Sequence, residues 1–191
     1  MEFREMNGVE GVLLTGGASR RMGTDKAGLP VEGRSLALKI AEELRKACEP
    51  VTVLGRRPLQ GFEFLLDEDE FQGPMAALAR FAPTQPYVFV ASCDLPLFES
   101  SVVQDLAARI EGYDAAIPDL GGRLQPLCAL YRREAFDRLR DLREKGEQRI
   151  MRWIDGLDIV TVPGWEATRN VNTPEEWSSL SQDLDGEDHR R

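Results

Sequence analysis

The chain has 191 residues, of which 42% are hydrophobic and 30% are charged, and its formal net charge is −9. This length suits one compact domain with a sizeable core. The acidic balance excludes a protein built around a nucleic-acid-binding face, which needs a basic surface, and the apolar runs are far shorter than a membrane span. A small phosphorylated ligand stays compatible with this charge, because a local basic loop can form on an acidic protein.

The N-terminal residues lack a signal-peptide pattern, which predicts a cytoplasmic protein. The three cysteines, Cys48, Cys93 and Cys128, have neither the spacing of a disulfide framework nor that of a zinc site. Cys93 and Cys128 lie in apolar runs, which predicts buried thiols. The single histidine, His189, lies in the charged tail, so a Ser–His or Cys–His catalytic pair lacks its base in the folded part.

Stretches typical of strands and of helices alternate along the chain. Short apolar runs predict strands, and apolar residues spaced three and four apart predict helices. Ser35 is the predicted cap of the first helix, and Gly73-Pro74 and Thr173-Pro174 have the pattern of helix starts. The predicted strands cover residues 9–14, 51–54, 62–66, 87–91, 114–118, 125–131 and 158–162. The predicted helices cover residues 35–47, 74–81, 102–110, 135–142 and 149–154, and one more begins at Thr173.

This alternation predicts an α/β protein with a three-layer, Rossmann-like architecture, in which helices cover both faces of a mostly parallel central sheet. The turn Gly121-Gly122-Arg123 between two strand-like runs predicts one antiparallel region. We expect a single domain over residues 1–180. The charged tail over residues 181–191 has little apolar surface to bury, which predicts disorder.

Polar residues follow three of the predicted strands. A glycine-rich loop follows Leu14, Asp67 follows Leu66, and Asp94 lies three residues after Ala91. Ligands of such folds bind beyond the carboxyl ends of the parallel strands. The sequence therefore predicts that these three features converge on one edge of the sheet.

The loop after the first strand contains three glycines together with Arg20, Arg21 and Lys26. Glycines allow a loop to turn its backbone N–H groups toward an anion, which favours a phosphate-binding loop for a nucleoside triphosphate. The spacing matches neither the Walker A pattern nor the dinucleotide Gly-x-Gly-x-x-Gly pattern. A solvated turn with exposed charges is the alternative that these residues leave open.

The loop nevertheless resembles a known signature. Leu-Thr-Gly-Gly-Ala-Ser-Arg-Arg-Met-Gly-Thr-Asp-Lys, which ends at Lys26, is similar to the Leu-Ala-Gly-Gly-x-Ser-x-Arg-Met-Gly-x-Asp-Lys signature of nucleotidyltransferases, and more narrowly of molybdenum cofactor guanylyltransferases. The resemblance covers about residues 9–180. Its further motifs are Gln72-Gly73-Pro74-Met75-Ala76, Cys93-Asp94-Leu95-Pro96, Gln125-Pro126-Leu127, Gly146-Glu147-Gln148-Arg149 and Asn170-Val171-Asn172-Thr173-Pro174-Glu175-Glu176.

The resemblance implies a nucleotidyltransferase fold and transfer of GMP from GTP to the terminal phosphate of molybdopterin, with Mg²⁺ as cofactor and pyrophosphate as the second product. Such an acceptor is already ionised, so catalysis depends on positioning and charge neutralisation rather than on a general base. GTP and molybdopterin are the implied partners, and cofactor-insertion proteins are further candidates. We expect no nucleic-acid or membrane partner, and a monomer or a weak oligomer.

The resemblance also implies roles for individual residues. Arg21 and Lys26 would neutralise charge on the α-phosphate and pyrophosphate, and Asp94 would be the Mg²⁺ ligand and the third catalytic residue. Asp67 would contact the ribose or the base. The full set of implied nucleotide contacts is Leu14, Thr15, Gly16, Gly17, Lys26, Asp67, Gly73 and Asp94. The implied contacts to the pterin substrate are Gln125, Arg149, Asn170 and Asn172.

Structural roles remain open for several of these residues. Asp94 has the alternative of a turn cap, and Asp67 that of opening a solvated acidic run. Asn172 precedes the predicted cap Thr173, and Asp25 is a candidate partner for the loop arginines. The three tryptophans, Trp153, Trp165 and Trp177, are interpreted as packing residues rather than as stacking platforms for a pterin.

The chain departs from the family pattern where a base would be selected. Thr15 replaces the usual Ala, Ala77 replaces the usual Gly, and Leu54-Gly55-Arg56 replaces an Asn-containing turn. A cytidylyltransferase of the related molybdenum branch and a sugar-phosphate nucleotidyltransferase are therefore alternative enzymes. A GTP-binding carrier without turnover is the alternative from another class, and intact Arg21, Lys26 and Asp94 argue against it.

Overall fold

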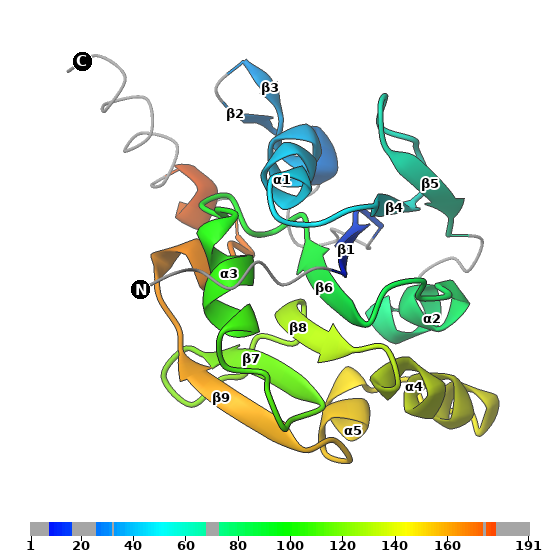
Figure 1. Ribbon diagram of the computed structural model, residues 1–191. Helices are drawn as coiled ribbons and strands as arrows, with labels where there is room; N and C mark the ends of the chain where they lie inside the picture. Colours follow the sequence, from blue (N-terminus) through cyan, green and yellow to red (C-terminus); the bar gives the residue numbers. More distant parts are fainter. Residues whose placement is uncertain (1–7, 17–25, 32, 68–72, 174, 179–191) are drawn as a thin grey trace.

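A seven-stranded sheet in the order β5-β4-β1-β6-β8-β7-β9 forms the centre of the computed structural model (Figure 1). The structure describes residues 8–16, 26–31, 33–67, 73–173 and 175–178, so the tail expected over residues 181–191 lies outside the described residues. The strands of the sheet are β1 (Val9–Leu14), β4 (Val51–Gly55), β5 (Glu63–Leu66), β6 (Tyr87–Ser92), β7 (Ala115–Asp119), β8 (Cys128–Arg132) and β9 (Ile159–Pro163).

The strand directions confirm the predicted fold class. β1 pairs in parallel with both β4 and β6, β4 with β5, and β7 with β9. β8 is antiparallel to both of its neighbours, β6 and β7. All strands of this sheet except β8 therefore end at one edge, which is called the carboxyl edge below, and begin at the opposite amino edge.

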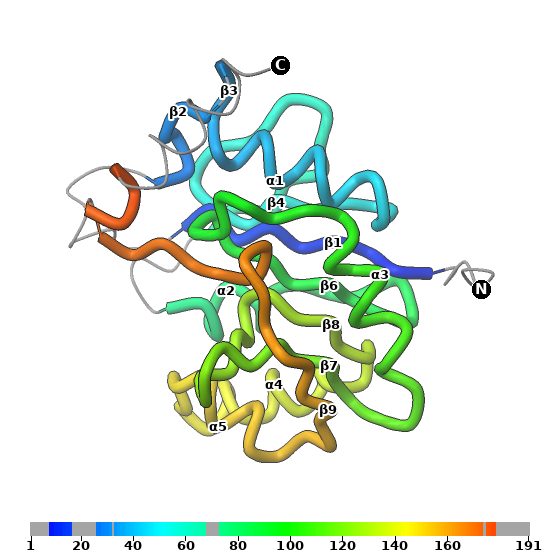
Figure 2. The backbone as a smooth tube through the Cα atoms, turned by 90° about the vertical axis from the view of Figure 1, so that its left-hand side faces the viewer, coloured from blue at the N-terminus to red at the C-terminus, as the bar shows by residue number. Residues whose placement is uncertain are grey.

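Helices cover both faces of the sheet (Figures 1 and 2). On one face lie α1 (Leu36–Arg45) and α3 (Ser101–Ala107), and on the other lie α2 (Pro74–Arg80), α4 (Ala135–Glu144) and α5 (Ile150–Ile154). Successive side chains of a strand point to opposite faces, and β1 follows this rule, since Leu13 packs with α1 whereas Val12 and Leu14 pack with α2. Each face of the sheet thus has its own hydrophobic core.

Local sequence explains where several helices begin. Ser35 caps α1 as predicted, because its side chain accepts a hydrogen bond from the Leu38 backbone N–H at 3.3 Å. Gly73 is the N-cap of α2, and its φ of 86° lies in the left-handed region that glycine adopts without strain. Residues 175–178 are helical, and the Glu176 backbone N–H donates to Thr173 Oγ1 at 3.2 Å, so the predicted threonine cap is confirmed.

Some predicted boundaries are wrong. The strand predicted over residues 125–131 begins only at Cys128, whose N–H closes a turn onto the Gln125 carbonyl at 3.0 Å. Pro126 has no N–H to offer a neighbouring strand, which explains the late start. α3 ends at Ala107 rather than at residue 110. The small pair β2 (Pro30–Val31) and β3 (Arg34–Ser35), and the single turns η1 (Lys26–Gly28) and η2 (Glu166–Thr168), were not predicted.

Aromatic packing agrees with the interpretation of the tryptophans. Trp153 is fully buried and stacks on Tyr131 with ring centroids 4.5 Å apart, while Trp165 and Trp177 pack at the rim of the other core. Among the helices that the structure describes, none combines the length and apolar character needed to cross a membrane.

Candidate active site

Backbone hydrogen bonds join the predicted site segments at the carboxyl edge. Cys93 N–H donates to the Leu14 carbonyl at 3.1 Å, Thr15 N–H to the Leu54 carbonyl at 2.8 Å, and Asp67 N–H to the Gly55 carbonyl at 2.8 Å. These bonds continue the parallel ladder beyond the strand ends. The ends of β1, β4, β5 and β6 therefore lie side by side, as the sequence predicted.

The backbone is tightly packed where β1 and β4 end. A Cβ atom on Gly55 would lie 1.9 Å from Thr15 Oγ1, and one on Gly16 would lie 3.0 Å from Asp67 Oδ2. Thr15 Oγ1 also donates to the Leu54 carbonyl at 3.2 Å. The threonine that departs from the family pattern thus fills the space left by the glycine of the departing turn.

Asp67 directly follows β5 and approaches this packed backbone. Its Oδ1 atom is buried, and it accepts no hydrogen bond from the residues that the structure describes. Buried polar atoms are almost always paired, so Oδ1, which has no partner among the described residues, is a candidate contact for a hydroxyl or an amine of a ligand.

Asp94 lies in the turn after β6 and is joined to β8. Ser92 Oγ donates a short hydrogen bond to Asp94 Oδ1, and the same hydroxyl contacts the Leu127 carbonyl at 3.4 Å. Burial, with a further contribution from the negative charge of Asp94, raises the pKa of the Cys128 thiol far above its ordinary value. Cys128 is consequently an inert packing residue, and Cys93 is only partly buried, contrary to the prediction that both thiols are buried.

Lys26 connects the start of the chain to its end. Its Nζ donates to the Val171 carbonyl at 2.8 Å and to Asn172 Oδ1 at 3.2 Å. The Val171 N–H in turn donates to the Asp94 carbonyl at 2.8 Å. A lysine, a carboxylate turn and an amide from three distant segments are thereby brought together at the carboxyl edge.

The helix cap fixes Asn172 from the other side. Glu176 Oε2 accepts from the backbone N–H groups of Asn172 at 2.7 Å and Thr173 at 3.2 Å, which completes a capping box with Thr173. These bonds, chiefly the one from Asn172, lower the pKa of the Glu176 carboxyl. Asn172 therefore has its backbone in the cap and its side chain on Lys26.

The remaining predicted residues lie at different places. Gly73 stands at the start of α2, and Gln125 is buried before β8, with its Nε2 donating to the Arg123 carbonyl at 3.0 Å. Arg149 is bound to Glu147 within its own loop, and Asn170 is partly exposed just before Val171. Gly17, Arg21 and Asp25 were also predicted to act in the loop after β1, and they lie outside the described residues.

Two contributors escaped the sequence reasoning. Ser92 orients Asp94, and the Val171 carbonyl binds Lys26. Ser92 directly precedes the Cys93-Asp94 motif, so its place at the strand end was a usable signal. The Val171 carbonyl offered none, because a backbone acceptor has no residue-type signature.

The carboxylates at this edge fit a divalent cation that is held mainly by the phosphates of a bound nucleotide. Among the described residues, no group of three or more His, Cys, Asp or Glu side chains could enclose a metal ion. Mg²⁺ typically takes one or two carboxylates and completes its shell with phosphate oxygens and water. Asp94, with only Oδ1 engaged by Ser92, is compatible with that mode of binding.

The fold and this edge define an α/β protein of the class whose ligands bind beyond the ends of the parallel strands. A family model described as "MobA-like NTP transferase domain" matches residues 11–160. The chain belongs to this family and is a nucleotidyltransferase.

Relatives agree over most of the chain. A protein of Nostoc sp. named "Probable molybdenum cofactor guanylyltransferase" is 28% identical over 195 residues, covering 94% of both chains. One of the same name from Mycobacterium avium is 31% identical over 187 residues, covering 90% of this chain and 94% of its own.

Solved structures share the fold at lower identity. Molybdopterin-guanine dinucleotide biosynthesis protein A from Archaeoglobus fulgidus has a TM-score of 0.75 at 22% identity and covers 93% of this chain and 99% of its own. A cytidylyltransferase for 2-C-methyl-D-erythritol 4-phosphate from Thermus thermophilus has a TM-score of 0.68 at 20% identity, covering 91% and 96%. A Mycobacterium tuberculosis protein in complex with manganese has a TM-score of 0.66 at 17% identity, covering 92% and 99%.

Proposed function

We propose that the protein transfers GMP from GTP to the phosphate of molybdopterin with the help of Mg²⁺. A phosphate oxygen of the acceptor attacks the α-phosphorus of GTP, the bond from the α-phosphorus to the bridging oxygen breaks, and pyrophosphate leaves. The names of the relatives that match 90% or more of this chain support the guanylyl reaction. The shared fold alone does not select the base, since a cytidylyltransferase has it as well.

The observation that carries this proposal is the chain of contacts from Lys26 through Val171 to Asp94. It holds a cation and a carboxylate at the same edge as the start of the loop after β1. Transfer between two polyanions needs positive charge at the reacting phosphates and a fixed approach of the acceptor. A protein that only carried GTP would not need this whole arrangement.

On the nucleotide side, the backbone at Leu14, Thr15 and Gly16 leads into the glycine loop that would hold the triphosphate. Lys26 Nζ would neutralise charge on the phosphates, and Arg21 is assigned the same task from its place in the motif. Asp67 would accept a hydrogen bond from the ribose or the base through its unpartnered Oδ1, and Gly73 would bring the start of α2 close to the nucleotide.

The metal would be held by Asp94 together with the phosphates. Bound there, Mg²⁺ would withdraw electron density from the phosphate oxygens and stabilise the charge that develops on them. The protein's part is to orient the carboxylate, which Ser92 does by its hydrogen bond to Oδ1. The manganese complex of a protein with the same fold supports a divalent cation in this fold.

On the acceptor side, we assign the pterin substrate to Gln125, Arg149, Asn170 and Asn172. Asn172 is the best positioned of them, because its side-chain oxygen contacts Lys26 Nζ, the cation to which we assign the phosphates. Gln125 supports the same edge through the turn that leads into β8. The acceptor would then lie between the end of β6, the start of β8 and the segment around residue 171.

The test is to incubate the protein with Mg²⁺, molybdopterin and each of the four ribonucleoside triphosphates in turn, and to measure pyrophosphate. We expect release with GTP that depends on both Mg²⁺ and molybdopterin. Release with CTP but not with GTP would overturn the guanylyl assignment. Tight binding of GTP with no release from any triphosphate would make the protein a carrier.

A further inference from the structure

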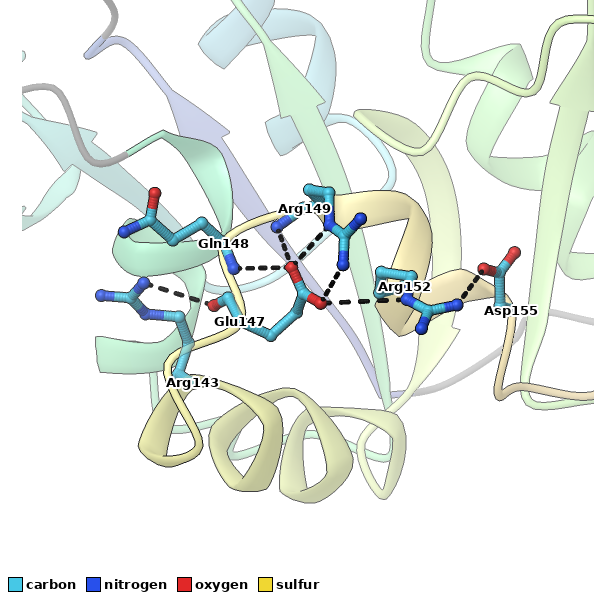
Figure 3. Close-up of polar contacts among 6 residues, drawn as sticks. All are labelled: Arg143, Glu147, Gln148, Arg149, Arg152 and Asp155. Atoms are coloured by element: carbon cyan, nitrogen blue, oxygen red, sulfur yellow. Dashed lines mark hydrogen bonds and ion pairs between the residues drawn. The ribbon is translucent and has the colours of Figure 1, made fainter.

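One carboxylate between α4 and α5 gathers an unusual number of donors. Glu147 Oε1 accepts from the backbone N–H groups of Gln148 at 2.9 Å and Arg149 at 3.0 Å, and from Arg149 Nε at 2.9 Å (Figure 3). Glu147 Oε2 accepts from Arg149 Nη2 at 2.8 Å and lies 3.8 Å from Arg152 Nε. Two guanidinium groups therefore meet at a single carboxylate.

Exposure separates the carboxylate from its partners. The Glu147 side chain is 19% exposed, whereas those of Arg149 and Arg152 are 72% and 58% exposed. Glu147 uses one edge of the Arg149 guanidinium, formed by Nε and Nη2, and a guanidinium carries five N–H donors in a planar fork. Glu147 does not use the other edge, with Nη1, and the Arg149 side chain as a whole is 72% exposed.

Arg152 lies one turn further along α5, where side chains three apart share a face. Arg152 Nη1 also lies 3.8 Å from Asp155 Oδ2. The Arg152 guanidinium therefore has a carboxylate on each side, and both ion pairs are longer than a hydrogen bond. The two arginines share Glu147, and Arg152 has Asp155 as a second partner. On a chain with a net charge of −9, two guanidinium groups that stay 72% and 58% exposed beside a more buried carboxylate offer N–H donors to an anion.

The topology directs this loop to the active edge. β8 runs to the amino edge, where Arg132 pairs with Tyr87, and the ten residues of α4 then span about 15 Å. After α5 the chain reaches β9, which starts beside Ala115 at the amino edge again. The chain thus leaves the amino edge along α4 and returns to it at β9, so the α4–α5 connection lies toward the carboxyl edge. Figure 2 shows this connection (yellow) toward the left, the side on which β1 ends.

We infer that Glu147 is a positioning residue for Arg149, and that Arg152 supplies a second positive charge for the same ligand. Together they would receive the phosphate of the acceptor and deliver it to the edge that carries Lys26 and Asp94. This inference rests on the proposed function. It adds two residues to the acceptor site: Glu147, which acts through Arg149, and Arg152, which acts directly on the anion.

The test measures KM for molybdopterin and KM for GTP separately in Glu147→Gln, Arg152→Gln and Arg149→Gln. We expect each to raise the acceptor KM by roughly 5- to 20-fold, the effect of one charge-assisted contact, with the GTP KM changed less than about twofold. Because Glu147 acts through Arg149, Glu147→Gln should add little in an Arg149→Gln background. Matched controls are Glu134→Gln and Arg109→Gln, which remove exposed ion pairs on other segments.

Acceptor KM values that stay at the control level while the wild type turns over would overturn the inference and leave the proposed function intact. Multiplicative effects of Glu147→Gln and Arg149→Gln would overturn the positioning role. If the wild type uses another triphosphate, the guanylyl assignment fails, and the same acceptor KM values in that reaction decide the inference. Direct binding of molybdopterin, followed by pterin fluorescence, gives a readout that needs no turnover and is expected to weaken in the same variants.

Discussion

Two carboxylates at opposite edges of the sheet differ in how they are satisfied. Glu10, at the start of β1, is 1% exposed and accepts from Thr84 N–H at 2.6 Å, Thr84 Oγ1 at 3.1 Å and Gln85 N–H at 2.8 Å. Asp67, after β5, keeps a buried Oδ1 with no hydrogen-bond partner among the described residues. Both oxygens of Glu10 thus accept hydrogen bonds, whereas one buried oxygen of Asp67 accepts none from the described residues.

This difference is the one expected between a structural carboxylate and the ligand contact that we propose for Asp67. Glu10 ties the loop before β6 to the central strand, and both of its oxygens accept hydrogen bonds from that loop. An unpaired buried oxygen costs free energy, and such a cost is typical of a site whose partner arrives with the ligand. We therefore expect the amino edge of the sheet to serve stability and propose that the carboxyl edge serves chemistry.

The largest expected effects are on turnover at the carboxyl edge. Lys26→Ala and Asp94→Asn should each lower kcat by about 10²- to 10³-fold, the range seen when one preorganised group that stabilises transition-state charge is removed. Asp94→Asn should also shift the Mg²⁺ titration to higher concentration. Lys46→Ala, which removes an exposed lysine on the surface near α1, is the control. An unfolded Lys26→Ala protein would instead assign Lys26 a structural role through Val171.

The close packing at the carboxyl edge predicts a loss of stability. Gly55→Ala should lower the free energy of unfolding by about 1–3 kcal/mol, because its Cβ would lie 1.9 Å from Thr15 Oγ1. The double variant Thr15→Ala, Gly55→Ala should recover most of this loss, since the hydroxyl is gone. Urea unfolding measures both. Additive losses in the double variant would show that the two residues do not share the space.

The two carboxylates themselves give a matched pair of amide substitutions. Glu10→Gln should lower the free energy of unfolding by about 1–2 kcal/mol, because two backbone N–H groups lose a charged acceptor, and it should leave nucleotide affinity unchanged. Asp67→Asn should change stability little and weaken nucleotide binding about tenfold, as expected for one lost hydrogen bond to a charged group. Calorimetry measures nucleotide affinity and urea unfolding measures stability in both variants. Loss of nucleotide affinity in Glu10→Gln, with loss of stability in Asp67→Asn, would reverse the assignment of the two edges.

The smallest effect is the pH response of a third carboxylate. The hydrogen bond from the Arg149 side chain is the largest cause that lowers the pKa of Glu147 from 4.5 to about 2. A carboxyl whose folded pKa is depressed contributes its full stabilisation above its unfolded pKa and loses it as pH falls toward the folded one. The Glu147–Arg149 contact should therefore persist at pH 4 and be lost near pH 2. An NMR titration of the Glu147 carboxyl carbon measures this, and a midpoint near 4.5 would contradict it.

Sequence patterns predicted what depends on local composition. The bounds of β1 were predicted because Val9–Leu14 is a short, mostly apolar run, and the meeting of the segments around Leu14, Asp67 and Asp94 followed from the rule for parallel strands. The contact of Lys26 with Val171 spans 145 positions of the chain and depends on tertiary packing. The fit of Thr15 against Gly55 depends on atomic distances, which no residue pattern encodes.

The part proposed for Glu147 could not be predicted from the sequence either. Its motif was recognised, yet attention fell on Arg149, the residue that resembles a substrate contact. The carboxylate's role follows only from the geometry of four hydrogen bonds onto its two oxygens. Ala77, interpreted as a residue near the base, lies in α2 and is buried in the core on that face of the sheet, where its methyl group packs against neighbouring side chains.

Hydrogen–deuterium exchange with and without GTP and Mg²⁺ tests the contrast between the two edges most directly. The account predicts slower exchange at the carboxyl edge, in peptides that contain Leu14–Gly16, Asp67, Asp94 and Asn172. It predicts unchanged exchange at the amino edge, in peptides that contain Thr84 and Gln85. Protection confined to the amino edge, or none at the carboxyl edge despite saturating GTP, would contradict the placement of the active site.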